Sequence, residues 1–353
     1  MSDMSTDRPA GDKPKGSTLR TVGITALVVW SFWLWGMLSG DRWALFADNW
    51  FMSVTMVFGS FIAGATSEGG GAVAFPVMTL MFEIAPGTAR DFSLMIQTVG
   101  MIAAGLAILT TGIRVERHAL VWSSLGGAVG VILGLEFVAG LLPPAFAKML
   151  FMSTWVAFAF ALLLINRYHD REVHRDITNF LPRHCVLLVA TGVVGGVITS
   201  ITGSGLDITT FALLVLRLRI TEKVATPTSV VLMGINAAVG FAWKGLAGPG
   251  MAPEAWNYWW VCVPIVVLGA PFGAWFIKKR SRHFVSRLLY ASIAIQFVAA
   301  ILIIPMTSTL AAFSVGIFAL GLLFFRWMAN RGVRRLTWLK EEGHTSTPPE
   351  AVS

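Results

Sequence analysis

The sequence is short of charge. Only 13% of its 353 residues are charged, whereas 55% are hydrophobic and the mean hydropathy is +0.70. A soluble domain carries about 25% charged residues. Several uncharged windows reach about 20 residues, the length that crosses about 30 Å of hydrocarbon. The composition therefore excludes an ordinary soluble fold and predicts an all-α polytopic membrane protein.

Other absences exclude enzyme and cofactor classes. Cys185 and Cys262 are the only cysteines, so neither a disulfide framework nor a metal spacing follows from them. The six histidines fall in loops or at span ends without a metal-ligand spacing, and there is no phosphate-binding GxxxxGK[ST] motif. We therefore expect no enzyme, no cofactor, no metal and no ATP hydrolysis. The first 20 residues are polar, so no cleavable signal peptide is expected.

What is present is a repeat of two polar, glycine-bearing breaks. Thr66-Ser67-Glu68-Gly69-Gly70-Gly71 lies inside an apolar run, and 136 positions on it falls on Thr202-Gly203-Ser204-Gly205-Leu206-Asp207 inside another. The register continues outside the breaks, where Gly59, Ala89 and Ser93 fall on Gly195, Ala225 and Ser229. Matched breaks in two hydrophobic halves indicate the substrate site of a repeat-built transporter.

The lengths of the apolar runs predict two broken hairpins among ordinary spans. Residues 50–82 and 184–218 are too long for one span and too short for two, so each predicts a re-entrant pair of half-helices. Each hairpin is followed by three spans, and one further span lies at each end of the chain. The expected organisation is a disordered tail (1–18), a first membrane half (19–165), a linker (166–183), a second half (184–328) and a polar tail (329–353).

The basic residues decide the topology. With two hairpins and a cytoplasmic N-terminus, 23 of the 27 Lys and Arg face the cytoplasm, and only Arg42, Arg90, Lys148 and Lys244 lie outside. The net charge of +8 is thus explained by membrane anchoring rather than by nucleic acid. Because three spans follow each hairpin, the two halves are inverted relative to one another. Both termini are expected in the cytoplasm.

The breaks supply the candidate substrate site. Glycines let a ligand approach bare backbone, and the N-terminus of the half-helix that follows offers N–H groups to an anion. The alternatives are close helix packing for the glycines, a bond to the local backbone for the hydroxyls and a bond between helices for the amides. The substrate-binding set is Ser67, Gly69, Gly70, Gly71, Gln97, Thr202, Gly203, Ser204, Gly205, Ser229 and Asn236.

Glu68 and Asp207 are the most informative charges. An ionisable side chain at membrane depth predicts a function, because its desolvation is costly. Two carboxyl groups fit a purely anionic site badly when ionised, so they suggest proton coupling. The alternative for Glu68 is a cap at a half-helix N-terminus. Glu136, Arg90 and Lys244 are better explained as interfacial residues.

The first break resembles a known family motif. Ser67-Glu68-Gly69-Gly70-Gly71-Ala72 through Phe75-Pro76 resembles the glycine-rich N-terminal motif of the TauE/SafE sulfite exporter family, and Val224-Ala225-Thr226-Pro227-Thr228-Ser229 resembles the segment after its hairpins. The resemblance covers roughly 54–304. It implies a multi-pass carrier of the bacterial inner membrane for sulfite, sulfoacetate or related anions. The second break lacks the triple glycine, and Glu68 and Asp207 depart from a simple anion carrier.

The sequence thus predicts a secondary transporter of a small anion, embedded in a lipid bilayer and open to proton coupling. Two alternatives stay open: a cation/proton antiporter built on Glu68 and Asp207, and a non-transporting membrane assembly partner. Whether the protein is a monomer or a homodimer, which anion it moves and in which direction are not decided by the sequence.

Overall fold

The computed structural model describes residues 15–166, 173–177, 180–278 and 280–341. These residues form helices and one isolated bridge, between His174 and Ile220, and they contain no strand. The predicted all-α class is confirmed. Ten of the described helices are long and apolar enough to cross a membrane. The tail residues 1–14 and 342–353 and parts of the predicted linker lie outside the described residues.

The first half and the second half have the same order of elements. The chain begins with α1 (Lys15–Ser39). The first half then contains α2 (Leu45–Ala65), α3 (Gly69–Pro76), the π-helical turn η1 (Val77–Met81), α4 (Pro86–Thr110), α5 (Arg117–Phe137) and α6 (Pro144–Asn166). The second half contains α7 (Pro182–Thr202), α8 (Leu206–Ala212), the π-helical turn η2 (Leu213–Arg217), α9 (Glu222–Leu246), α10 (Pro253–Ile277) and α11 (Arg282–Ile303).

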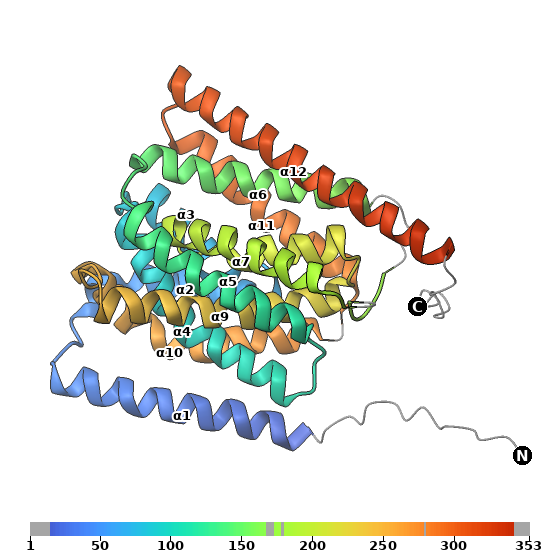
Figure 1. The fold of residues 1–353 in the computed structure, drawn as a ribbon. Coiled ribbons are helices and arrows are strands. Elements are labelled where there is room, and N and C mark those ends of the chain that lie inside the picture. Colours follow the sequence, from blue (N-terminus) through green and yellow to red (C-terminus); the bar gives the residue numbers. More distant parts are fainter. Residues whose placement is uncertain (1–14, 167–172, 178–179, 279, 342–353) are drawn as a thin grey trace, which may run out of the picture.

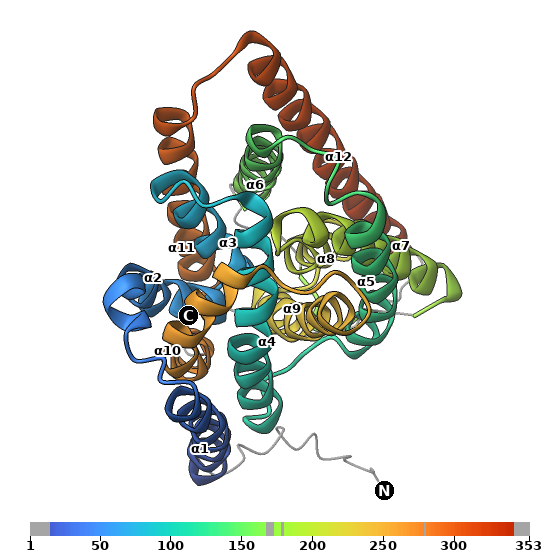
Figure 2. The ribbon, with the colours of Figure 1, turned by 90° about the vertical axis from the view of Figure 1, so that its left-hand side faces the viewer.

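The bounds of these elements follow the offset found in the sequence. Moved by 136 positions, η1 and α4 fall on η2 and α9 residue for residue, and the start of α5 falls on the start of α10. Each half therefore consists of a broken helical pair followed by three helices. The final helix, α12 (Ser308–Glu341), and α1 lie outside this scheme and at opposite edges of the bundle (Figure 2).

The helix α12 continues past Met328, where we expected the last span to end in a polar tail. The difference has a local reason. Residues 329–341 contain arginine, leucine, lysine and glutamate, which are good helix formers, and no proline. Polar composition was therefore a poor guide to where the last helix ends.

The first broken pair, α2 with α3 and η1, folds back on itself. Phe51 near the start of α2 and Phe82 just after η1 have ring centroids 4.0 Å apart. Nearer the tip, a Cβ placed on Gly59 would lie 3.4 Å from Cγ1 of Val73. The two limbs are therefore antiparallel. We call this pair hairpin 1 and the pair of α7 with α8 and η2 hairpin 2.

The two hairpins start from opposite ends of the bundle. The C-terminal ends of α1, η1, α5, α9 and α11 lie at one end of the bundle in Figure 1, and those of α4, α6, η2 and α10 lie at the other. Hairpin 1 therefore starts and finishes at the first end and hairpin 2 at the second. The start of α1 and the end of α12 also lie at the second end (Figure 1).

Part of the linker is fixed at this second end. The backbone N–H of His174 donates to the carbonyl of Arg219 (2.8 Å), and that of Thr221 donates to the carbonyl of His174 (2.9 Å). The N–H of Ile177 donates to Oε2 of the buried Glu116 (3.1 Å). The linker is thereby attached both to the exit of hairpin 2 and to the start of α5.

Glycine faces join each hairpin to the opposite half. On α5 and α7, Gly126, Gly130 and Gly196 approach the backbone of the facing helix so closely that a Cβ at any of them would collide with it. On α2 and α10, Gly64 and Gly273 do the same. Small residues allow such contacts, which hold helices together in lipid by van der Waals packing. α5 is thus packed against hairpin 2, and α10 is packed against hairpin 1.

We expect Gly196→Leu to separate α5 from α7. A Cβ at this position would lie 2.6 Å from the Val131 nitrogen and 2.9 Å from the Gly130 carbonyl carbon, and neither backbone atom can move cheaply. The variant should lose about 1–3 kcal/mol of stability, seen as a lower unfolding temperature of the purified protein. Gly316→Leu on α12 is the control, because nothing lies within 4 Å of its Cβ. Equal unfolding temperatures for the two variants would contradict the packing described here.

Candidate functional site

The tips of the two hairpins touch in the interior of the bundle. Oγ of Ser204, in the tip of hairpin 2, lies 2.9 Å from the backbone oxygen of Glu68, in the tip of hairpin 1. These two residues are 136 positions apart, so each occupies the place of the other in the repeat. Both side chains are fully buried. Contact between equivalent positions is what an axis of pseudo-symmetry through the tips would produce.

Glycine is required where the tips meet. Gly69 and Gly203 have φ values of +74° and +81°, in the left-handed region that favours glycine. A Cβ on Gly69 would collide with Oδ2 of Asp207 and would lie 2.7 Å from Oε1 of Gln97. A Cβ on Gly71 would lie 3.1 Å from the Gly203 carbonyl oxygen. The absence of side chains therefore lets the backbone of each tip reach the other hairpin.

Gln97 of α4 joins the tip of hairpin 2 to the first half. Its Nε2 donates to the carbonyls of Ser93 (3.0 Å) and Gly203 (2.7 Å), so its orientation is fixed by two backbone acceptors. Its Oε1 is buried and has no hydrogen-bond partner. Since most buried polar atoms are paired, an unpaired amide oxygen at this junction needs an explanation.

The N-terminus of α3 lies buried at the tip of hairpin 1. Its N-cap residue is Glu68, but no side chain caps the helix. The first N–H groups of a helix, here those of Gly69, Gly70 and Gly71, have no partner within it and carry partial positive charge. Oγ of Ser67 is buried beside them and also has no hydrogen-bond partner. This half-helix therefore presents neutral donors in the interior of the protein.

The alternative in which Glu68 caps α3 is wrong. Its Oε2 accepts a hydrogen bond from Ser292 of α11 (2.6 Å) instead. Its Oε1 has no partner. Ser292 in turn accepts from Nε2 of Gln296 (2.9 Å), one turn further along the same helix. The carboxyl group thus leaves the helix terminus and faces α11.

The tip of hairpin 2 is more fully satisfied by its own side chains. Oδ1 of Asp207 accepts from the N–H of Ile208 (2.9 Å), and Oδ2 lies 2.8 Å from Oγ of Ser204. Thr202 donates within the tip, to the carbonyl of Ser204 at 2.7 Å. Gly205 is needed for packing, since a Cβ there would lie 2.6 Å from Cγ2 of Ile198. The donors of this tip are mostly engaged, in contrast to those of α3.

Ser229 and Asn236, two of the predicted substrate-binding residues, have surroundings that differ from those of the tip residues. Ser229 donates to the carbonyl of Thr226 in the same helix (2.8 Å). This is the local backbone bond that was the alternative to substrate binding for the hydroxyl groups. Asn236 lies near Gly127 of α5 and is buried, with both side-chain polar atoms unpaired. No hydrogen bond of either side chain reaches a tip within the described residues. Their roles stay predictions.

Sequence reasoning missed the α11 residues Ser292 and Gln296. They lie four residues apart on one face of the second half of α11, which is otherwise apolar, and a polar i, i+4 pair in such a segment was a usable signal. It also missed Trp155 of α6, which is buried with an unpaired indole nitrogen. Nothing in the sequence around this tryptophan separates it from a packing residue.

Several charged groups outside the tips are bound to other side chains. Arg90 and Lys244 both bind the buried Asp91, Arg90 through its Nη2 at 2.8 Å. Asp91 also accepts from the N–H of Ala252 (3.0 Å), so it ties α4 to α9 and α10. Glu136 accepts from Nε1 of Trp243 (2.8 Å) at an exposed position. Among the described residues, no group of His, Cys, Asp and Glu is arranged to hold a metal ion.

Comparison with known proteins agrees with this architecture. The family described as Sulfite exporter TauE/SafE matches residues 52–302. This range begins within α2, contains both tips and ends at the penultimate residue of α11. No curated protein and no solved structure gave a significant match. The matched range covers well over half of the chain. The chain therefore belongs to the TauE/SafE sulfite exporter family, whose members are membrane transporters of sulfite or related anions.

Proposed function

We propose that this protein is a secondary transporter that moves a small anion across the bacterial inner membrane by alternating access. Sulfite, a sulfonate such as sulfoacetate, or a related organic anion is the substrate. The observation that carries the proposal is the contact between two glycine-rich tips that start from opposite ends of the bundle. Both termini lie in the cytoplasm in this proposal, since that orientation places most of the basic residues there.

The anion binds at the N-terminus of α3. Its donors are the N–H groups of Gly69, Gly70 and Gly71 together with the hydroxyl of Ser67, which are buried and not capped by any side chain. Helix N-termini bind anions because free N–H groups and the helix dipole act together. The burial of this terminus strengthens the interaction, since the attraction increases as the effective dielectric constant falls.

Alternating access follows from the arrangement of the hairpins. Each hairpin shields the tips from one end of the bundle, and each is packed on a helix of the opposite half through glycine contacts. Rocking one half against the other would open the junction first to one side and then to the other. Transporters built from inverted repeats work in this way around a fixed central site.

Protons are the coupling ions in this proposal. Ser204 Oγ lies 2.9 Å from the Glu68 carbonyl oxygen and 2.8 Å from Oδ2 of Asp207. The hydroxyl carries one hydrogen, so it can donate to only one of these oxygens at a time. Both contacts are hydrogen bonds when Asp207 is protonated and donates to Ser204. Neutral carboxyl groups would also let an anion approach without repulsion.

A second candidate is a cation/proton antiporter that uses Glu68 and Asp207. The observation in its favour is that Oε1 of Glu68 and Oε1 of Gln97 are buried acceptors without donors. A cation would satisfy such oxygens, whereas an anion would not. The two functions predict different results. In the antiporter, Glu68→Gln together with Asp207→Asn abolishes ion movement, and neither the variant nor the unmodified protein binds an anion.

An imposed pH gradient should accelerate sulfite flux into proteoliposomes, and Glu68→Gln should abolish the acceleration, because the amide cannot carry a proton. Glu136→Gln is the matched control, since its carboxyl group is exposed and bound to Trp243. If the pH gradient does not change sulfite flux through the unmodified protein, the proposal of proton coupling is wrong. This result would leave the anion site in place.

The glycines of α3 provide a matched pair of variants. A Cβ on Gly70 would make only ordinary contacts, at 3.5 Å or more, whereas a Cβ on Gly71 would lie 2.7 Å from Nε2 of Gln97 and 2.9 Å from Cβ of Ser93. We expect Gly71→Ala to reduce sulfite flux at least about tenfold, since a misplacement of about 1 Å can cost two orders of magnitude in rate. Gly70→Ala should keep most of it. Equal flux through both variants would contradict a close fit at the tips.

A further inference from the structure

Trp155 is a buried donor without an acceptor. It lies in α6, is 1% exposed and stacks on Phe151 with ring centroids 4.3 Å apart. Its indole nitrogen has no hydrogen-bond partner. A tryptophan N–H normally finds an acceptor when it is buried.

Other tryptophans of this chain follow that rule. The N–H groups of Trp30, Trp33 and Trp259 donate to the backbone carbonyls of Pro264 (3.1 Å), Trp260 (2.7 Å) and Met95 (3.3 Å). That of Trp243 donates to Glu136. Trp155 is more deeply buried than the first two and still lacks an acceptor. The difference points to an acceptor that the chain itself does not supply.

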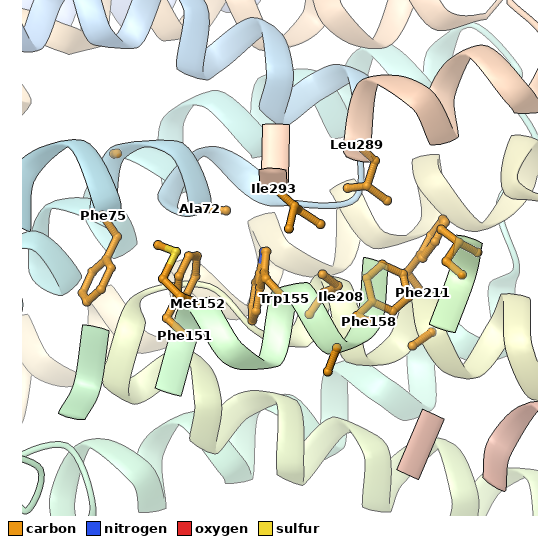
Figure 3. Close-up of a cluster of buried hydrophobic side chains, with 14 of the residues drawn as sticks. Ala72, Phe75, Phe151, Met152, Trp155, Phe158, Ile208, Phe211, Leu289 and Ile293 are labelled. Atoms are coloured by element: carbon orange, nitrogen blue, oxygen red, sulfur yellow. The ribbon is translucent and has the colours of Figure 1, made fainter. Parts of the chain in front are cut away.

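The indole lies in the part of α6 that packs against α3, α8 and α11. In Figure 3 its nitrogen-bearing edge points between Ala72 of α3 and Ile293 of α11, and Ile208 of α8 lies next to the ring. All four residues belong to one cluster of buried side chains. Ala72 directly follows the glycines of α3. Ile293 directly follows Ser292, whose hydroxyl donates to Glu68. The free N–H therefore points toward the region between α3, which begins with these glycines, and α11, whose Ser292 holds the carboxyl group of Glu68.

The surroundings favour a ligand with one negative charge. The hydrogen bonds of the tip residues, within the described part of the chain, include no lysine or arginine side chain, and the ionisable groups there are the two acids Glu68 and Asp207. Neutral donors beside an apolar wall of Ala72, Ile208 and Ile293 can stabilise one charge. A second charge would be desolvated without a partner, which is costly.

We propose that Trp155 is a substrate-contacting residue, whose indole N–H donates to a singly charged oxyanion bound between hairpin 1 and α11. The inference rests on the proposed anion site at α3 and adds a donor from a third element to it. Methanesulfonate and sulfate are suitable probes, because both present sulfonyl oxygens and they differ by one charge.

The test is Trp155→Phe, which keeps an aromatic ring against Phe151 and removes the N–H. The KM for sulfite flux in proteoliposomes should rise about 5- to 10-fold, the effect of one lost hydrogen bond. Trp33→Phe is the control, because it removes an indole N–H that lies on α1 and is bonded to Trp260. Its KM should not change.

A second measurement observes the indole N–H of Trp155 directly and does not depend on whether Trp155→Phe folds. In the ¹⁵N spectrum of indole groups, the Trp155 signal should move on addition of methanesulfonate and much less on addition of sulfate. The signal is assigned by incorporating benzothienylalanine at position 155, which keeps the ring shape without the N–H. This substitution should raise the KM as Trp155→Phe does.

The outcomes separate the two proposals. Saturable sulfite flux with an unchanged KM in Trp155→Phe and an unmoved Trp155 signal would overturn the role of Trp155 and leave the proposed function standing. A stronger response to sulfate than to methanesulfonate would overturn the preference for one charge. If folded, unmodified protein neither binds nor moves any of these anions, both proposals are wrong.

Discussion

The structure depends on the contact between the two tips. Backbone that leaves helical geometry at membrane depth must find partners in the protein or in a wet cavity, because lipid offers none. Here the protein supplies the partners: Ser204 in the tip of hairpin 2 reaches the carbonyl of Glu68 in the tip of hairpin 1, and Gln97 of α4 reaches the carbonyl of Gly203. Glu68 and Ser204 are equivalent positions of the sequence repeat, so the contact between the hairpins is made where the two halves correspond.

The remaining helices hold the tips at this distance. α5 on hairpin 2 and α10 on hairpin 1 use glycine faces, so the position of each hairpin is set by a helix of the other half. At the ends of the bundle, polar contacts take over: Asp91 joins α4 to α9 and α10, and Glu116 holds the linker. α11 contributes the hydrogen bond that holds the carboxyl group of Glu68 away from the N-terminus of α3. No side chain therefore caps the half-helix of hairpin 1, whereas in hairpin 2 Thr199 accepts from the N–H of Leu206 and Asp207 accepts from the N–H of Ile208.

Much of the fold could be predicted from the sequence, and much less of the site. The matched breaks 136 positions apart and the distribution of Lys and Arg predict two hairpins that start from opposite ends. Both features can be read directly from the sequence. The direction in which Glu68 points could not be predicted, because its partner Ser292 is 224 positions away and carries no signal near the break. The same is true of Trp155, which a sequence cannot distinguish from a packing residue. The end of α12 was misplaced because charged residues that favour a helix resemble a tail in composition.

The central claim is that the tips form one site that opens in turn to each side of the membrane. The most direct test places a single cysteine at Ser67, after replacement of Cys185 and Cys262, and measures its modification by a charged, membrane-impermeant thiol reagent in right-side-out and inside-out vesicles. The account predicts modification from both sides, slowed by sulfite in each case. Modification from one side only, or rates that no anion changes, would contradict it.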